Sequence, residues 1–193
     1  MEKKVNKWLK YCIIILLPLF ILFLSFKTTI FFTDYSTHQQ NAVDYLQDKT
    51  ELEGNYTAAE RFHMEDVQKV FNKGNTIFWL LGLSVIVTLY FIKKEKGLIK
   101  ELLLKSGLLT ISIIILILFA IFLNFNTIFT LFHTIFFPQG NWQFPFDSFL
   151  IQTFPLEFFT KMSILIFSQA LSWGILFILL SLLLKHEMVH QQK

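Results

Sequence analysis

Residues 106–135, SGLLTISIIILILFAIFLNFNTIFTLFHTI, contain no Asp, Glu, Lys or Arg. A helix needs only about 20 apolar residues to cross the roughly 30 Å hydrocarbon core of a membrane. A segment in lipid must also satisfy its own backbone hydrogen bonds, so it must be helical. The run therefore indicates a transmembrane helix. Its excess length predicts that Phe132–Phe137 emerges at the membrane surface.

Three further apolar runs accompany this one. The chain has 193 residues, is 54% hydrophobic and contains 24 Phe, a composition typical of multi-span membrane proteins. The first run follows a Lys-rich start and has no small-residue cleavage site after it, so we expect it to remain as a span. We detect no internal repeat. The sequence predicts an all-α membrane protein, 1–193 forming a single integral membrane domain, with four transmembrane helices at about 9–32, 75–92, 106–125 and 162–184.

The distribution of lysines predicts the orientation. Loops rich in Lys and Arg face the cytoplasm, and with four spans the three Lys-rich segments share one side. Both termini are then cytoplasmic, and the segments 33–74 and 126–161 form an extracellular cap of two interfacial segments. The lysines are Lys3, Lys4, Lys7 and Lys10 before the first span, Lys93, Lys94, Lys96, Lys100 and Lys105 between the second and third, and Lys185 and Lys193 after the fourth.

The two outer segments differ in character. In the first, TAAE at Thr57–Glu60 has the pattern of a capping box that starts a helix, and Gly74 suits a left-handed position that ends it. The second is rich in Phe, and its prolines exclude one straight helix. We expect a folded aromatic layer there, which either anchors the protein or forms a pocket for an acyl chain. The prolines are Pro138, Pro145 and Pro155.

Two histidines are candidates for chemistry. His63 lies on the apolar stripe of the first outer helix, and His133 lies in the second outer segment. Each alone reads most simply as a packed interfacial histidine, but their occurrence in both segments favours a pair. Glu60 and Asp66 flank His63 at three-residue spacing, where a carboxylate can fix the tautomer of an imidazole. The remaining histidines lie in a polar loop or tail and read as solvated: His38, His186 and His190.

Other reaction chemistries find little support. Cys12 is the one cysteine and lies at the predicted cytoplasmic end of the first span, so it is neither part of a disulfide framework nor a nucleophile at the outer site. No G-x-S-x-G or H-E-x-x-H pattern is present. A zinc site on His63, Asp66 and His133 is a disfavoured alternative, and we predict no metal and no cofactor. The sequence contains no patch of basic and aromatic residues of the kind that binds nucleic acid.

Two motifs carry a family resemblance. E-x-x-H-M-x-D-V occurs at residues 60–67, and F-H-x-x-F-F-x-x-G-x-W-x-F occurs at residues 132–144, with Asp147 and Pro155 beyond it. Together they resemble the four-span lipoprotein intramolecular transacylases of Gram-positive bacteria. The resemblance covers nearly the whole chain, including the span count and the two outer segments.

The resemblance implies an acyltransferase of the bacterial cell membrane, with its active site at the extracellular interface. The substrate would be a diacylated lipoprotein, whose sn-2 acyl chain moves from the S-diacylglyceryl group to the α-amine of the same N-terminal cysteine. His63 and His133 would be catalytic. Membrane lipid would be the only other partner, and we expect a monomer. Residues expected to support the pair or bind substrate are Tyr56, Glu60, Asp66, Phe136, Phe137, Trp142 and Asp147.

This chemistry agrees with the residues. An α-amine has a pKa near ~8, and a histidine is a matched general base for it. Because the attacking amine belongs to the substrate, no Ser or Cys nucleophile is required, and the carboxylates beside His63 favour it as the base. The alternatives are a non-catalytic accessory or lipid-binding protein and a metal-dependent membrane hydrolase. A transporter is disfavoured because the spans hold few ionisable residues.

Overall fold

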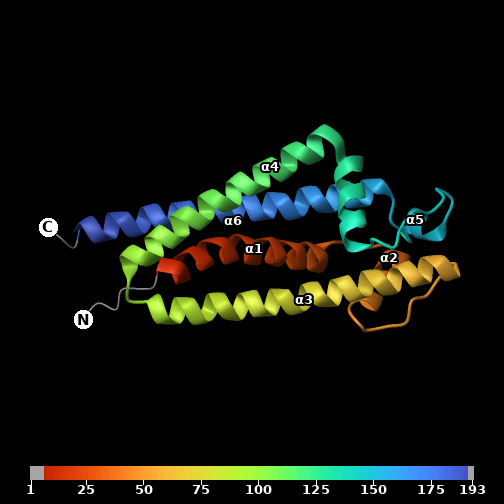
Figure 1. Cartoon of the computed structure of the whole chain (residues 1–193), viewed down its shortest axis with the longest axis horizontal. Coiled ribbons are helices and arrows are strands. Elements are labelled where there is room, and N and C mark those ends of the chain that lie inside the picture. The colour runs from red at the N-terminus through yellow and green to blue at the C-terminus, as the bar shows by residue number, and fades with distance from the viewer. Residues whose placement is uncertain (1–6, 191–193) are drawn as a thin grey trace. The chain divides into compact units, whose positions relative to one another are not determined.

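The computed structural model describes residues 7–190, with side chains for residues 10–184, and within these residues the regular secondary structure is helical, without strands. Four helices are long and apolar enough to cross a membrane, which confirms the predicted all-α fold with four transmembrane helices. The predictions made for Lys3, Lys4, Lys7, Lys185, His186, His190 and Lys193 fall outside the described side chains. The elements are α1 (Lys7–Phe32), α2 (Thr37–Leu46), α3 (Ala58–Ile92), α4 (Lys96–Phe136), α5 (Phe149–Thr153) and α6 (Leu156–His190) (Figure 1).

The chain divides into two compact units. Unit 1 holds the chain up to Thr28, the stretch Phe78–Leu118 and the chain from Leu165 onward. Unit 2 holds Thr29–Ile77 and Phe119–Ile164. Each unit is built from parts of the same long helices.

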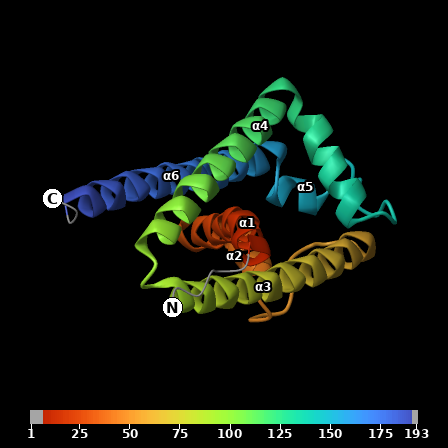
Figure 2. The same ribbon diagram turned by 60° about the vertical axis from the view of Figure 1, so that its left-hand side comes forward.

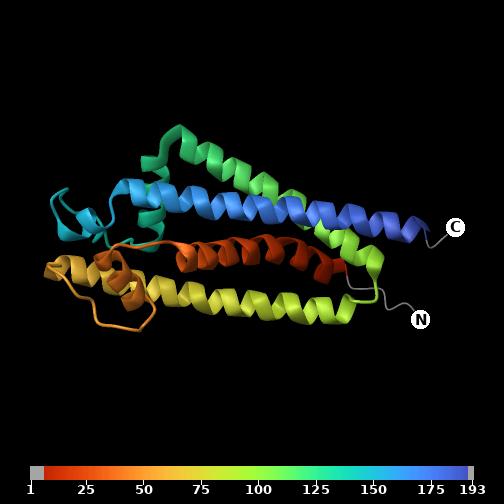
Figure 3. The ribbon, with the colours of Figure 1, turned by 180° about the vertical axis from the view of Figure 1, so that it is seen from behind.

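Unit 1 is a bundle of apolar helix segments that run side by side (Figure 3). Its largest buried cluster joins Ile21 of α1, Ile114 of α4 and Ala170 of α6. The backbones of α4 and α6 approach closely at Gly107 and Gly174, where a Cβ built on Gly107 would lie 2.8 Å from the Gly174 carbonyl oxygen. Small residues allow this kind of contact between membrane helices.

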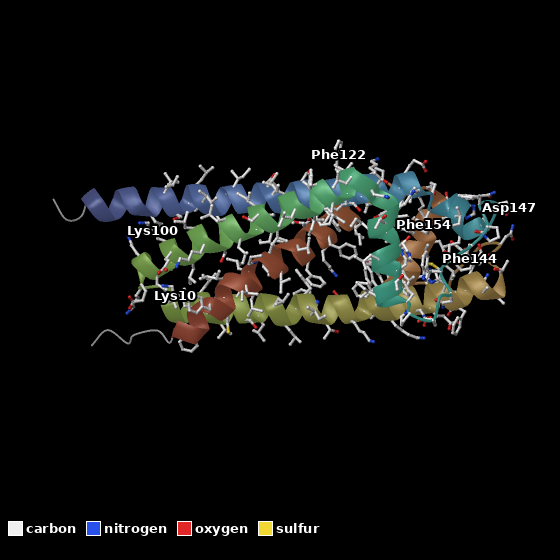
Figure 4. All side chains as sticks on the ribbon, turned by 45° about the horizontal axis from the view of Figure 1, so that its top comes forward. Lys10, Lys100, Phe122, Phe144, Asp147 and Phe154 are labelled. Atoms are coloured by element: carbon white, nitrogen blue, oxygen red, sulfur yellow. The ribbon has the colours of Figure 1, made fainter. Side chains whose placement is uncertain are left out.

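Polar side chains add links between the helices of unit 1. Thr28 donates to Gln169 Oε1 at 2.6 Å, joining α1 to α6, and Ser181 donates to the Lys100 carbonyl at 3.0 Å, joining α6 to α4. Lys10 of α1 forms an ion pair with Glu101 of α4. Figure 4 labels Lys10 and Lys100 at the end of this unit where the ion pair lies.

Helix α3 corrects one prediction made from the sequence. Gly74 does not end a short helix, because α3 continues without interruption to Ile92. A glycine inside a helix costs only about 1 kcal/mol relative to alanine. Ending the helix there would leave several backbone groups unpaired next to an apolar segment, which costs more.

Helix α4 changes direction at Asn124, whose φ of −163° and ψ of 92° are not helical (Figure 2). The Asn124 side chain accepts a hydrogen bond from the Thr127 N–H at 3.1 Å, so it caps the second part of the helix. Asparagine competes for backbone hydrogen bonds in this way, which disfavours it inside helices. The bend was not predicted from the uncharged, apolar run of residues 106–135.

Unit 2 contains a second helix that the sequence analysis missed. The polar segment around His38 was interpreted as a loop, but it forms α2 behind a capping box in which Ser36 and Gln39 bond to each other's backbone amides. Gln39 also donates to the Thr153 carbonyl at 2.8 Å, which joins α2 to α5. The core of unit 2 is the buried cluster Ala42, Leu52, Tyr56, Met64 and Leu150, with Phe144, Phe149 and Phe154 packed against it.

Candidate active site

The carboxylate of Glu60 fixes the start of α3. Its Oε2 accepts hydrogen bonds from the Thr57 N–H at 2.6 Å and the Thr57 hydroxyl at 2.8 Å, which confirms the predicted capping box. Its Oε1 accepts the Leu150 N–H at 2.8 Å, in the first turn of α5. Burial raises the pKa of Glu60, but the bonds from Leu150 and Thr57 outweigh it and the net pKa is lowered. One buried carboxylate thus ties two helix N-termini together in unit 2.

The first turns of α3 and the second part of α4 bring His63 and His133 together. Their ring centroids are 6.3 Å apart and their planes differ by 26°. Both side chains are buried, with 6% and 9% exposure. Phe137, 3% exposed, contacts both, with ring centroids 4.9 Å from His63 and 5.6 Å from His133. The paired histidines expected from the sequence therefore lie side by side in an aromatic environment.

The tautomer of His133 follows from one hydrogen bond. Its Nδ1 lies 2.8 Å from the Phe129 carbonyl oxygen. A carbonyl can only accept, so the ring is protonated at Nδ1 and Nε2 keeps its lone pair. Phe129 and Trp142 pack against the ring at centroid distances of 4.0 and 4.9 Å, which hold its orientation.

Burial disfavours the charged form of both rings. It lowers the pKa of His63 to about 4, with repulsion from His133 as the second cause. It also lowers the pKa of His133, although the bond to the Phe129 carbonyl opposes this. Both histidines lie outside the predicted spans 75–92 and 106–125. At neutral pH the pair is uncharged, so each ring has a lone pair available to accept a proton.

Asp66 does not bond to His63 directly. Its Oδ2 accepts hydrogen bonds from Gln139 Nε2 at 2.8 Å and Asn141 Nδ2 at 2.9 Å, and its Oδ1 pairs with Lys69 at 2.9 Å. The ion pair with Lys69 and the two amides lower the pKa of Asp66, which stays ionised. Asp66 thereby fastens the loop after α4 to α3.

Gln139 and Asn141 were not singled out by the sequence analysis. They flank Gly140, whose φ of 75° makes the turn that lets both amides reach Asp66. The sequence feature that could have identified them is their polarity, because QGN interrupts a segment otherwise dominated by Phe and Pro. Polar residues placed among aromatic ones need partners, and here the partner is Asp66.

The other predicted supporting residues separate into two groups. Phe137 and Trp142 contact the histidines. Tyr56 is buried in the core of unit 2, where its ring packs on Phe149 at 4.8 Å. Phe136 is 45% exposed and packs on Phe132. Asp147 is exposed in the turn before α5, and Figure 4 shows it at the outer edge of unit 2.

Metal ligands do not converge in the described part of the chain. No group of three or more His, Cys, Asp or Glu side chains there is placed to hold a metal ion. The set considered from the sequence, His63, Asp66 and His133, is included in that finding. Cys12 is a free, exposed thiol on α1 in unit 1.

Comparisons with known proteins agree on one family. A sequence model described as lipoprotein intramolecular transacylase Lit matches residues 33–159, which include both histidines and Asp66. An in meso structure of the membrane integral lipoprotein intramolecular transacylase Lit from Bacillus cereus has a TM-score of 0.84 at 19% identity, covering 95% of this chain and 97% of that chain. A variant of that protein with a histidine-to-alanine mutation has a TM-score of 0.78 at 18% identity, covering 95% of both chains. The search of curated sequences gave no significant match.

Proposed function

Because this chain belongs to the lipoprotein intramolecular transacylase family, we propose that it moves one acyl chain within a single lipoprotein molecule. The substrate is a diacylated bacterial lipoprotein whose N-terminal cysteine bears an S-diacylglyceryl group. The sn-2 acyl chain passes to the α-amine of that cysteine. The product is a lyso-form lipoprotein that is N-acylated and retains one chain on the glyceryl group.

The observation that carries this proposal is the buried pair of His63 and His133, 6.3 Å apart among aromatic rings. Two neutral imidazoles with available lone pairs suit a reaction in which one proton leaves a nitrogen and another reaches an oxygen. Aromatic walls suit an acyl chain, and exclusion of water suppresses ester hydrolysis, the competing reaction. The nucleophile arrives with the substrate, so positioning accounts for much of the rate, up to roughly 7–11 kcal/mol.

During the reaction one proton moves from the attacking amine to the glyceryl oxygen. The neutral α-amine attacks the ester carbonyl carbon, forming the C–N bond and a tetrahedral adduct. His63 takes the proton from the attacking nitrogen, which becomes strongly acidic once bonded. The proton then passes from His63 to Nε2 of His133, which delivers it to the glyceryl oxygen as the C–O bond breaks. The pair ends neutral, as it began.

We assign His63 as the base because a carboxylate network stands behind it. Asp66 reaches toward His63 through Asn141 and raises the pKa of the imidazole, opposing the effect of burial. His133 has only the Phe129 carbonyl on its Nδ1 side. The Asp66–Asn141 network partly offsets the strong lowering of the His63 pKa by burial, and the assignment of His63 as the base rests on that network.

We also propose a location for this chemistry. Lysines concentrate in the connection between α3 and α4, at Lys93, Lys94 and Lys96, which supports a cytoplasmic location for that connection. Both termini then lie on the cytoplasmic side. Unit 2, with residues 33–74 and 126–161, faces outward as an extracellular cap, where lipoprotein headgroups are found. The protein acts as a monomer in contact with membrane lipid.

The exposed aromatic side chains near His133 contact the acyl chain of the substrate in this proposal. Phe132 and Phe136 are 47% and 45% exposed and pack on each other, and Phe132 touches the His133 ring at 5.5 Å. Exposed apolar rings next to His133 suit contact with the acyl chain of a membrane-bound substrate. Tyr56 and Glu60 act differently, because they support the cap from its core.

The decisive experiment is mass spectrometry of the N-terminal lipopeptide of a reporter lipoprotein. The reporter lipoprotein is produced in cells that lack this activity, with and without this protein. If the proposal is right, the total mass of the lipopeptide is unchanged. Its fragment ions then show that one acyl chain has moved from the glyceryl group to the amine. A lipopeptide lighter by one acyl chain would instead indicate a hydrolase. An unaltered lipopeptide, with the protein folded in the membrane, would indicate an accessory or lipid-binding role.

A further inference from the structure

Two buried polar atoms near the histidine pair lack partners that meet hydrogen-bond geometry. They are Nδ1 of His63 and Oδ1 of Asn141. A buried donor or acceptor without a partner costs about 1–3 kcal/mol, and proteins rarely retain one without reason. Here the two atoms are complementary, since an imidazole N–H can donate and an amide oxygen can accept.

The orientation of the Asn141 amide follows from Asp66. The carboxylate of Asp66 can only accept, so the group that bonds to it at 2.9 Å is the Asn141 NH2. The oxygen of the same amide is then the atom available to His63. The contact already acts on His63, because Asn141 raises the pKa of the imidazole against the effect of burial.

We infer that Asn141 is a positioning residue, which receives its orientation from Asp66 and holds His63 as the Nδ1–H tautomer, with the lone pair on Nε2. This inference rests on the proposed function, in which His63 is the base. Catalytic hydrogen bonds are often long in a ligand-free enzyme and tighten around substrate. The bond from His63 to Asn141 closes as His63 gains its proton, because a charged donor strengthens it.

Gln139 supplies a matched control. It donates to the same oxygen of Asp66, at 2.8 Å, but it is exposed and is not among the groups that shift the pKa of His63. Gln139→Leu and Asn141→Leu each remove one amide from Asp66. Only Asn141→Leu removes the acceptor for His63. A purely structural role in fastening the loop would make the two variants behave alike.

The test uses the full chain in micelles with ¹⁵N-labelled histidine, whose ring signals separate protonated from unprotonated nitrogens. His63→Gln identifies the His63 signals. Wild type and Gln139→Leu should show His63 protonated at Nδ1 alone, and Gln139→Leu should transacylate within about twofold of wild type. Asn141→Leu should show both tautomers and lose at least about tenfold in rate, because general-base catalysis contributes about 10²–10⁴-fold. Asp66→Asn leaves Asn141 in place but removes the carboxylate that fixes its amide, so it should also show both tautomers, which covers the case that Asn141→Leu does not fold.

A single Nδ1–H tautomer in Asn141→Leu, or mixed tautomers in wild type, would overturn the inference. Equal rate losses in Asn141→Leu and Gln139→Leu would also overturn it. Failure of the proposed function looks different. In that case the wild-type protein does not transacylate, while the ring signals still decide whether Asn141 sets the tautomer.

Discussion

The carboxylate of Glu60 accepts the backbone N–H of Leu150, a residue 90 positions further along the chain, at 2.8 Å. Since the same side chain caps α3 through Thr57, it sets the position of His63 one helical turn later. A residue that the sequence suggested as a partner of the histidine therefore acts on the backbone instead.

Glu60→Gln should lower the thermal midpoint of unfolding by several degrees. The glutamine amide presents an NH2 to N–H donors where the carboxylate accepted them, and a buried mismatch of this kind costs about 1–3 kcal/mol. Thermal unfolding in detergent measures the effect. The control is Glu65→Gln, on the same helix but exposed. Equal midpoints for the two variants would contradict the role given to Glu60.

His63→Gln and His133→Gln should each reduce transacylation by at least about 100-fold, because each removes one half of the proton transfer. The lipopeptide assay gives the rate. His38→Gln is the matched control, since His38 is exposed on α2 and packs only on Phe149 among the described ring contacts. If either variant kept wild-type activity while folded, that histidine would not be part of the machinery.

The pH dependence of kcat/KM should reflect the substrate amine rather than a histidine. The amine attacks when neutral, so the rate should rise about tenfold per pH unit up to its pKa near ~8. His63, facing His133 and the Asp66 network, has a pKa of about 4, so it is already unprotonated across that range. No inflection should occur near 6.5. A slope of two in the plot of log kcat/KM against pH, between pH 5 and 6.5, would show that His63 titrates normally.

Stability should also depend on the protonation of His63. Its pKa is lower in the folded state, about 4, than the ordinary value of 6.5, so the unfolded chain binds the proton more readily. The contribution is complete above pH 6.5 and is lost as the pH falls toward 4. The unfolding midpoint of wild type should therefore fall more between pH 7 and 5 than that of His63→Gln. Parallel pH curves for the two proteins would refute this.

Gly107→Ala should destabilise the bundle of unit 1. The added Cβ would lie 2.8 Å from the Gly174 carbonyl oxygen and 3.0 Å from Ile178 Cγ1, so α4 and α6 must separate. Gly97→Ala, near the start of α4, meets nothing within 4 Å and should be neutral or slightly stabilising. Thermal unfolding compares the two. A midpoint for Gly107→Ala as high as that of Gly97→Ala would mean that the close contact is unimportant.

The features that could be predicted from the sequence depend on local patterns. Hydropathy identified four membrane-crossing helices because span length is set by the membrane. Thr57 and Glu60 identified a cap because a capping box is contained in four residues. The same rule, applied to Ser36 and Gln39, would have identified α2 in the segment read as a loop.

The remaining features depend on tertiary contacts. The course of α3 through Gly74 is decided by the apolar segment beyond it rather than by the glycine. Asn141 becomes important only because the turn at Gly140 brings it to Asp66, 75 residues earlier. The proximity of His63 and His133 likewise requires the second part of α4 to return beside α3, and no spacing rule contains that information.

The bend at Asn124 affects how many membrane crossings the apolar length of α4 suggests. A straight helix of 41 residues would be about 60 Å long, twice the thickness of the hydrocarbon core. Such a run could be counted as two crossings, which would make the total odd and put the two ends of the chain on opposite sides. Instead, α4 changes direction at Asn124, and the described part of the chain has four helices long and apolar enough to cross a membrane, an even number. The bend at this one asparagine is thus information about the path of α4 that its apolar length does not contain.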